Sequence, residues 1–196
     1  RSVQKKPNKH IGIGCIITLG LLTISTISSS ASLKRSSIQY TDKRFLYSFE
    51  ALVNAEHEKV ISKLHNFDQW HKLNDNISKS KVLETLSERK IKRLLTLTQC
   101  IFTFCFNLKF VEVINLSANR LQMDIIPGEG SFSAGRAIWE TSSDETNRTM
   151  IRVNATLTPS FWVPPVIGPL VLEKVFLKQL NKTIKKIETL AESKDI

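Results

Sequence analysis

Apolar and polar residues alternate along several stretches of this chain, and that period of two predicts the strands of an antiparallel sheet. The clearest stretch is 149–158, where every second residue from Ile151 to Leu157 is apolar and the residues between them are polar. The same alternation opens segment 44–53, and weaker versions predict strands at 81–87, 90–106, 108–116, 120–126 and 132–140. One buried and one solvated face is typical of a sheet that is covered on a single side.

Two other parts of the chain follow a helical period. Asn54 is suited to cap a short helix through Glu56–Leu64, and a second short helix would contain Trp70. A proline-rich joint at 158–169 precedes the longest helical pattern, at 170–193. The apolar stripe of that pattern consists of Leu172, Phe176, Leu180, Ile184, Ile187 and Ala191. We therefore expect an α+β fold in which the C-terminal helix covers one face of the sheet.

The first 32 residues contain four basic residues, no acidic residue, and an apolar stretch at 11–27 that ends in small residues. This order predicts a secretory signal peptide cleaved after Ala31, or an uncleaved membrane anchor. A mitochondrial presequence is the third alternative. The protein would then be exported, to the periplasm or the medium, or attached to a membrane. We expect residues 33–43 to be a linker and residues 44–193 to form one domain.

The charge of the chain divides between the leader and the domain. The formal net charge is +10, and without residues 1–32 there remain 24 basic and 18 acidic residues, a net +6. Much of this excess lies on the C-terminal helical pattern, at Lys174, Lys178, Lys182, Lys185 and Lys186. A membrane surface is therefore favoured over nucleic acid as the partner. A hydrophobic content of 41% excludes a disordered polycation, and three Cys are too few for a disulfide-stapled miniprotein.

Residues for catalysis or metal binding form no recognisable motif. None of the four His has metal-ligand spacing, and no Ser-His-Asp or Cys-His order stands out. Cys100 and Cys105 lie five residues apart in one predicted strand, which predicts that they face opposite sides and stay unpaired. Unpaired thiols favour an anchored domain that faces the cytosol.

Two charged residues share a strand face with aromatic residues and are candidates for holding the polar head of a ligand. Glu112 has the parity of Phe110, and Arg136 has the parity of Phe132. An exposed strand charge is the alternative for both. Asp124 has the opposite parity to the apolar residues of its strand and should face outward.

The order of elements and two segments resemble the START-like polyketide cyclase/dehydrase and lipid-transport superfamily (SRPBCC), in the branch that includes coenzyme Q-binding domains. The segments are FLYSFEALVNAEHEKVISKLHNFDQWHKL and GEGSFSAGRAIWETSSDETNRTMIRVNATLTPSFWVPPVIGPLVLEKVFLKQLNKTIKKIETLAE. The second segment contains Trp139, Thr149 and the joint Pro159–Pro164 at places that match the family pattern. The chain departs from that pattern at Ala137, where the family usually has Gly, and at Gln69–His71.

The resemblance implies a helix-grip fold, with a curved antiparallel sheet wrapped around the C-terminal helix, two short helices after the first strand, and an apolar cavity. It implies binding, and possibly transfer, of a lipid, quinone or polyketide-like molecule, without catalytic residues, a cofactor or a metal. A cyclase or dehydrase acting in the same cavity is the alternative. The candidates for lining the cavity or its rim are Trp70, Phe104, Phe110, Glu112, Phe132, Arg136, Trp139, Phe161, Trp162 and Phe176. For the aromatic strand residues, a filled core is the alternative interpretation.

Overall fold

The computed structural model describes residues 30–101, 104–163 and 168–193, with the backbone alone for Ile101, Phe104 and residues 168–175. Within these residues the strands are β1 (Ser32–Thr41), β2 (Arg44–Val53), β3 (Ile77–Ser87), β4 (Lys90–Ile101), β5 (Phe104–Ser117), β6 (Arg120–Ile125), β7 (Phe132–Ser143) and β8 (Thr149–Pro159). The helices are α1 (His57–His65), the short 3₁₀ helix η1 (Phe67–Lys72) and α2 (Gly168–Glu192).

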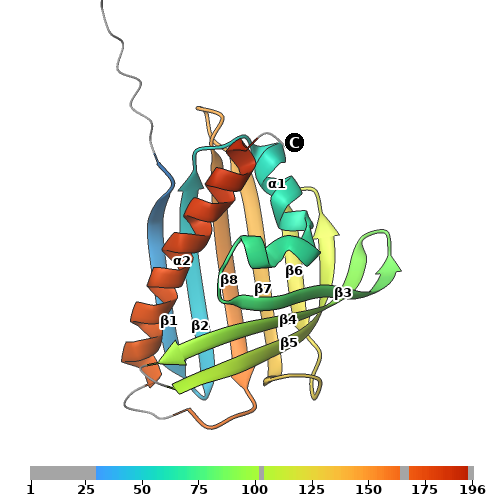
Figure 1. Ribbon diagram of the computed structural model, residues 1–196, viewed down its shortest axis with the longest axis vertical. Helices are drawn as coiled ribbons and strands as arrows, with labels where there is room; N and C mark the ends of the chain where they lie inside the picture. The colour runs from blue at the N-terminus through green and yellow to red at the C-terminus, as the bar shows by residue number, and fades with distance from the viewer. Residues whose placement is uncertain (1–29, 102–103, 164–167, 194–196) are drawn as a thin grey trace, which may run out of the picture.

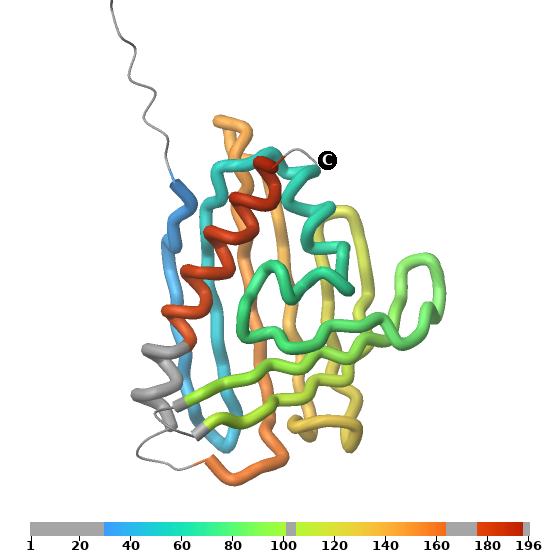
Figure 2. The backbone as a smooth tube through the Cα atoms, viewed as in Figure 1, coloured from blue at the N-terminus to red at the C-terminus, as the bar shows by residue number. Residues whose placement is uncertain are grey.

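The eight described strands form one antiparallel sheet in the order β1-β2-β8-β7-β6-β5-β4-β3. The sheet bends strongly, so that β3, β4 and β5 run across the lower front of the molecule while β1, β2, β8 and β7 stand behind them (Figures 1 and 2). α2 lies diagonally over β1 and β2, and α1 lies beside its C-terminal end. The expected α+β architecture, with the long helix on one face of the sheet, is confirmed.

The core lies between the concave face of the sheet and the helices. Alternate residues of β2 and β8 point into it, among them Ala51, Val53, Ile151 and Val153, all buried. The apolar stripe of α2 meets them with Leu180, Ile184, Ile187 and Ala191. Burial of this face is the main stabilising contribution, because each large aliphatic side chain removed from water contributes about 1.5–3 kcal/mol.

Glu188 fixes the C-terminal half of α2 to two other parts of the chain. One oxygen of its carboxylate accepts the backbone N–H of Ala31 at 3.0 Å, just before β1. The other oxygen accepts the N–H of Asn54 at 2.8 Å, at the end of β2. The carboxylate thereby joins the helix to both strands on which it lies.

Most of the segment expected to be a linker, 33–43, belongs instead to strand β1, which ends at Thr41 and pairs with β2 along its length. Asp42 and Lys43 form the two-residue turn between these strands, with φ values of 50° and 59°. Such primed turns usually contain Gly or Asn, because both central residues need positive φ. Asp is also common at the first of these positions, where Asp42 lies, but Lys43 replaces the usual Gly at the second, so the turn signature in the sequence is incomplete.

The predicted strand 90–106 is in fact two strands, β4 and β5, which form a hairpin. Cys100 of β4 is directly opposite Cys105 of β5, and the two are joined by a disulfide. The prediction of unpaired thiols on opposite faces was therefore wrong. Its cause is the absence of Gly, Pro, Asn or Asp between the two cysteines, which left no turn signal to divide the apolar run.

The predicted leader, residues 1–29 in particular, lies outside the described residues. In the described part of the chain, no helix has the length and apolar character needed to cross a membrane.

Candidate ligand-binding site

A charged pair occupies the interior of the sheet, where β4 and β5 run side by side. Arg93 and Glu112 are direct cross-strand partners, and both side chains point to the concave face. Arg93 is fully buried and Glu112 is 5% exposed. Nε of Arg93 donates to Oε1 of Glu112 at 2.9 Å, and Nη2 donates to the same oxygen. The pair is electrically neutral as a whole, which is the condition for burying charge at moderate cost.

Aromatic rings of η1 cover the guanidinium. Its central carbon lies 4.0 Å from the ring centroid of Trp70 and 5.2 Å from that of Phe67, both within cation–π range. Two hydrogen bonds hold η1 in place: the indole N–H of Trp70 donates to the carbonyl of Leu64 at 2.9 Å, and Ser80 donates to the carbonyl of Phe67. The cation is thus enclosed by an aromatic surface with fixed geometry.

One donor of this guanidinium has no protein partner. Nη1 of Arg93 is the single buried side-chain nitrogen or oxygen without a hydrogen bond in the described part of the chain. Leaving a buried donor unsatisfied costs about 1–3 kcal/mol, and more for a charged group. Nη1 therefore retains the capacity to donate one further hydrogen bond to an oxygen acceptor.

Tyr47 places a second polar group beside this pair. Burial raises the pKa of the Tyr47 hydroxyl well above its ordinary value, and the negative charge of Glu112 raises it further. The hydroxyl therefore remains protonated at any physiological pH and can donate or accept a hydrogen bond. The Tyr47 ring is 5.2 Å from that of Phe176 on α2, so this residue bridges the sheet and the long helix.

Two aromatic clusters extend from the charged pair. In the first, the Trp139 ring lies 5.6 Å from Trp70 and 5.8 Å from Phe49. In the second, Phe132 lies 4.6 Å from Phe110 and 6.2 Å from Phe161. The first cluster contacts the charged pair through Trp70, and the second leads from β5 to the joint between β8 and α2.

The structure places the predicted site residues in three groups. Trp70, Glu112, Trp139 and Phe176 lie around the charged pair and Tyr47, as described above. The second aromatic cluster contains Phe110, Phe132 and Phe161. Trp162 is 78% exposed at the joint, and the side chain of Phe104 lies outside the described residues.

Arg136 does not share the concave face with Phe132. A bulge between Phe132 and Ala134 shifts the alternation of β7 by one residue, so that Ala137 and Trp139 point inward and Arg136 points out. Its Nε donates to Asp124 at 2.5 Å on the convex face. The predicted outward orientation of Asp124 is confirmed, and the predicted shared face of Arg136 and Phe132 was wrong.

Arg93, Tyr47 and Phe67 belong to this site but were missed as site residues. Arg93 interrupts an apolar alternation between Ile91 and Leu95, which is the signal for an inward-facing charge. An inward-facing charge indicates a buried ion pair only when the opposite charge is identified. Arg93 lies opposite Glu112 because of the register of the β4–β5 hairpin, which the sequence did not reveal.

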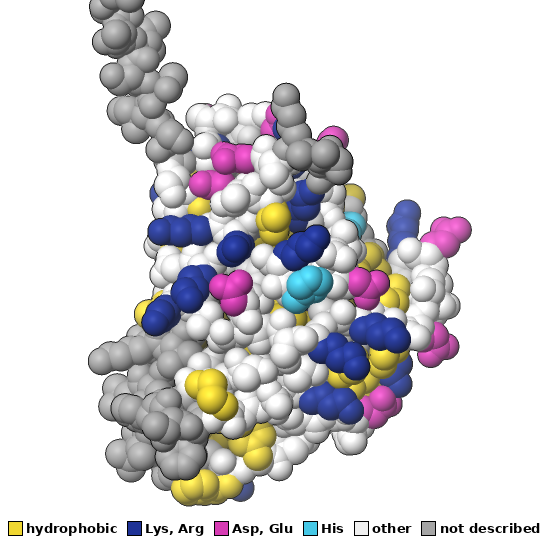
Figure 3. Space-filling view, viewed as in Figure 1, with side chains coloured by type: hydrophobic (Ala, Val, Ile, Leu, Met, Phe, Trp, Pro, Cys, Tyr) yellow, Lys and Arg dark blue, Asp and Glu magenta, His cyan; other side chains and the backbone are white. Residues whose placement is uncertain are grey.

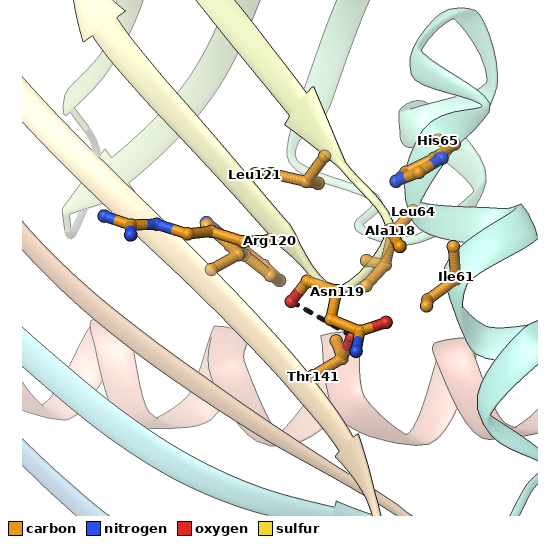
Figure 4. Close-up of a pocket in the computed structure, with 9 residues that line it drawn as sticks. Ile61, Leu64, His65, Ala118, Asn119, Arg120, Leu121 and Thr141 are labelled. Atoms are coloured by element: carbon orange, nitrogen blue, oxygen red, sulfur yellow. Dashed lines mark hydrogen bonds between the residues drawn. The ribbon is translucent and has the colours of Figure 1, made fainter. Parts of the chain in front are cut away.

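A small hollow beside α1 is a separate feature (Figure 4). It is lined by Leu64, His65, Asn119, Leu121 and Thr141 among others, and its volume of about 10 Å³ holds roughly one water molecule. Burial lowers the pKa of His65 at its edge. This hollow is too small for an organic ligand, and no cluster of metal-binding side chains occurs within the described residues.

No protein-family model matches the chain, and no curated protein matches it in sequence. Solved structures do match its fold. The Zhui aromatase/cyclase from a Streptomyces species aligns over 76% of this chain and 94% of its own, with 11% identity and a TM-score of 0.62. A STAR-related lipid transfer protein from Xanthomonas axonopodis aligns over 84% and 100%, with 10% identity and a TM-score of 0.63.

A START superfamily protein from Mycobacterium smegmatis aligns over 74% of this chain and 98% of its own, with 16% identity and a TM-score of 0.59. These likenesses establish the fold. The chain has the helix-grip architecture of these START-like structures, and the fold expected from its sequence is confirmed.

Proposed function

We propose that this protein binds a largely apolar molecule between the sheet and α2, and that one oxygen of that molecule accepts a hydrogen bond from Nη1 of Arg93. The observation that carries the proposal is the fully buried guanidinium with one unpartnered donor. A fold kept only for stability would gain from replacing such a pair with apolar residues, since buried ion pairs are often no more stabilising than hydrophobic substitutes.

The surroundings of Nη1 define the chemistry of the ligand. Glu112 already neutralises the guanidinium, so a neutral carbonyl or hydroxyl suits the site better than a carboxylate, which would add an uncompensated charge. The walls contributed by Phe49, Trp70 and Trp139 suit an apolar body. A lipid, quinone or polyketide-like molecule combines these features.

The fold neighbours support the same class of ligand. Their names describe an aromatase/cyclase and a lipid transfer protein, one acting on and the other carrying a molecule of this kind. Binding of the ligand is the first part of the proposal, and its transfer between membranes is a further part.

Replacing the charged pair by apolar residues tests the proposal. In the Arg93→Met/Glu112→Leu variant, both charges are removed together, so neither is left buried alone and the fold is retained. Losing a charge-assisted hydrogen bond should weaken binding of the methyl ester of dansyl-labelled undecanoic acid about tenfold to a hundredfold, measured by fluorescence titration.

The matched control is Arg152→Met/Glu50→Leu, which removes an ion pair of 3.2 Å from the half-exposed surface of β2 and β8. That variant should bind like the wild type. Unchanged affinity in the Arg93/Glu112 variant, with its fold intact by circular dichroism, would contradict the proposal.

A cyclase or dehydrase remains the second candidate, and Tyr47 beside Glu112 is the observation that bears on it. General acid–base catalysis requires a pKa near the working pH. The pKa of Tyr47 is displaced away from neutrality, which suits a hydrogen-bonding role better than proton transfer. We therefore favour non-catalytic binding.

We also propose that the end of the molecule that carries the joint docks on a membrane. Phe161 and Trp162 are 43% and 78% exposed there, and large exposed aromatic side chains beside prolines are suited to insertion at the lipid interface. Basic side chains are spread over the face with α2, among acidic ones, in Figure 3. An exported or membrane-anchored location, with a mitochondrial one as the alternative, completes this proposal.

A further inference from the structure

The end of the β4–β5 hairpin extends beyond the rest of the sheet. β3 pairs with β4 as far as Leu97, and the backbone N–H of Thr98 donates a further hydrogen bond to the carbonyl of Asn76. On the other side, β6 pairs with β5 from Glu112, and the turn before β7 reaches only as far as Lys109. Past these points, the described residues at 99–101 and 104–107 pair only within the β4–β5 hairpin. An isolated two-stranded ribbon is marginally stable in water.

The disulfide lies in this extension. Cys100 and Cys105 are both exposed and point to the convex face, away from Arg93 and Glu112. The side-chain hydrogen bond of 2.7 Å between Thr98 and Asn107 is the neighbouring link across the ribbon. On the other face, the side chain of Gln99 is buried and accepts a hydrogen bond from Nδ2 of Asn76 at 3.2 Å. The disulfide is the covalent link between the two strands at the end of the ribbon, beyond these contacts.

The same two strands carry the candidate site. From the disulfide inward, the pairs of the concave face are Gln99 with Phe106, Leu97 with Leu108, Leu95 with Phe110, and then Arg93 with Glu112. Phe110 stacks on Phe132, which contacts Phe161 in the joint before α2. Fraying of the ribbon would therefore loosen one wall of the site and its connection to the joint.

We propose that the Cys100–Cys105 disulfide controls ligand retention, so that the oxidised protein binds tightly and the reduced protein binds weakly. This inference rests on the proposed binding function. Formation of the bond takes two electrons and two protons from the two thiols. A disulfide-bearing oxidant of the thiol oxidoreductase class accepts both, and its own S–S bond is broken to give two thiols.

The inference also assigns a side of the membrane. Exposed disulfides form and persist in oxidising compartments and are rare in the cytosol. The third cysteine of the chain, Cys15, lies in the predicted leader, so both cysteines of the domain are accounted for by this bond. The domain therefore works on the oxidising side, which reverses the expectation drawn from unpaired thiols.

The full chain, purified in its oxidised form, is titrated with the methyl ester of dansyl-labelled undecanoic acid before and after reduction with dithiothreitol. Reduction should weaken binding roughly fivefold to tenfold, and reoxidation should restore it. The Cys100→Ser/Cys105→Ser variant should match the reduced protein, and Cys15→Ser should behave like the wild type in both states.

Hydrogen exchange over residues 90–117 provides the second measurement, which uses the folded wild type and does not depend on the variant. Reduction should raise exchange most strongly at 98–107. Equal affinity and equal exchange in the two states would overturn this inference and leave the proposed function standing. No binding in either state would overturn the proposed function, and this inference with it.

Discussion

At the scale of single residues, the buried Arg93–Glu112 pair needs an explanation, because apolar side chains at these positions could stabilise the fold equally well. Removing one partner, as in Glu112→Leu alone, leaves an uncompensated buried cation and should cost about 3–5 kcal/mol. Removing both partners, as in Arg93→Met/Glu112→Leu, should lower the free energy of unfolding much less, because no charge is then left buried alone. Arg93 is also held by the rings of Trp70 and Phe67, so its orientation is fixed before any ligand arrives. Such preorganisation reduces the entropy lost on binding.

Tyr47 gives this environment a measurable pH dependence. Its pKa is raised in the folded state, so above about pH 10 the unfolded chain ionises this phenol while the folded chain does not. The stability that the neutral phenol contributes is thus present below about pH 10 and is lost as the pH rises further.

Tyr47→Phe should therefore flatten the fall in stability between about pH 9 and pH 11, measured by urea unfolding at both values. Equal slopes for the variant and the wild type would show that the hydroxyl is solvated instead of enclosed beside Glu112.

At the scale of elements, the joint between β8 and α2 contains two aromatic residues in different environments, Phe161 and Trp162. Phe161 touches Phe132 with one edge while remaining partly exposed, and Trp162 projects into solvent. The joint therefore links the inner aromatic cluster to the surface, at the end where β5 and α2 begin (Figure 1). A ligand entering or leaving from a membrane would pass beside it.

Phe161→Ser/Trp162→Ser should lower the partitioning of the protein onto phosphatidylcholine–phosphatidylglycerol vesicles about tenfold or more, because two large apolar side chains no longer insert. Co-sedimentation measures this. The control is Leu83→Ser/Leu86→Ser, two leucines that are 46% and 43% exposed at the β3–β4 turn, away from the joint. An equal loss in both variants would point to general hydrophobic adsorption and contradict docking by the joint.

Sequence patterns predicted the elements wherever an apolar face is regular. The strand at 149–158 and the helix at 170–193 have almost the bounds seen in β8 and α2. The patterns failed where a turn lacks its usual residues, as at Asp42–Lys43 and between Cys100 and Cys105. They failed again at the bulge in β7, since one inserted residue reverses which side chains face inward.

The candidate site shows the same limits. Glu112 and Trp70 could be selected from parity and from the resemblance, because each lies in a locally regular pattern. Arg93 could not be joined to Glu112 without the hairpin register, and Arg136 was given a face that the bulge changes. A site made by pairing distant residues depends on the register of strands, which local periodicity does not contain.

At the scale of the whole molecule, α2 lies over β1 and β2, and the charged pair lies inside, near the beginning of β4 and away from the Cys100–Cys105 end of the hairpin. The first described residues and the C-terminal end of α2 lie together at the top of Figure 1, where Glu188 accepts the N–H of Ala31. The exposed joint lies at the opposite end. A leader retained as an anchor would therefore leave the chain at the end away from the proposed docking surface.

The central claim is that the interior holds an apolar molecule through Arg93, and native mass spectrometry of the protein purified without detergent tests it most directly. The account predicts that the wild type carries, or takes up from a total lipid extract, one class of apolar molecule that contains an oxygen acceptor. The Arg93→Met/Glu112→Leu variant should lose it, and Arg152→Met/Glu50→Leu should keep it. A wild-type protein observed only at its own mass, before and after incubation with the extract, would contradict the account.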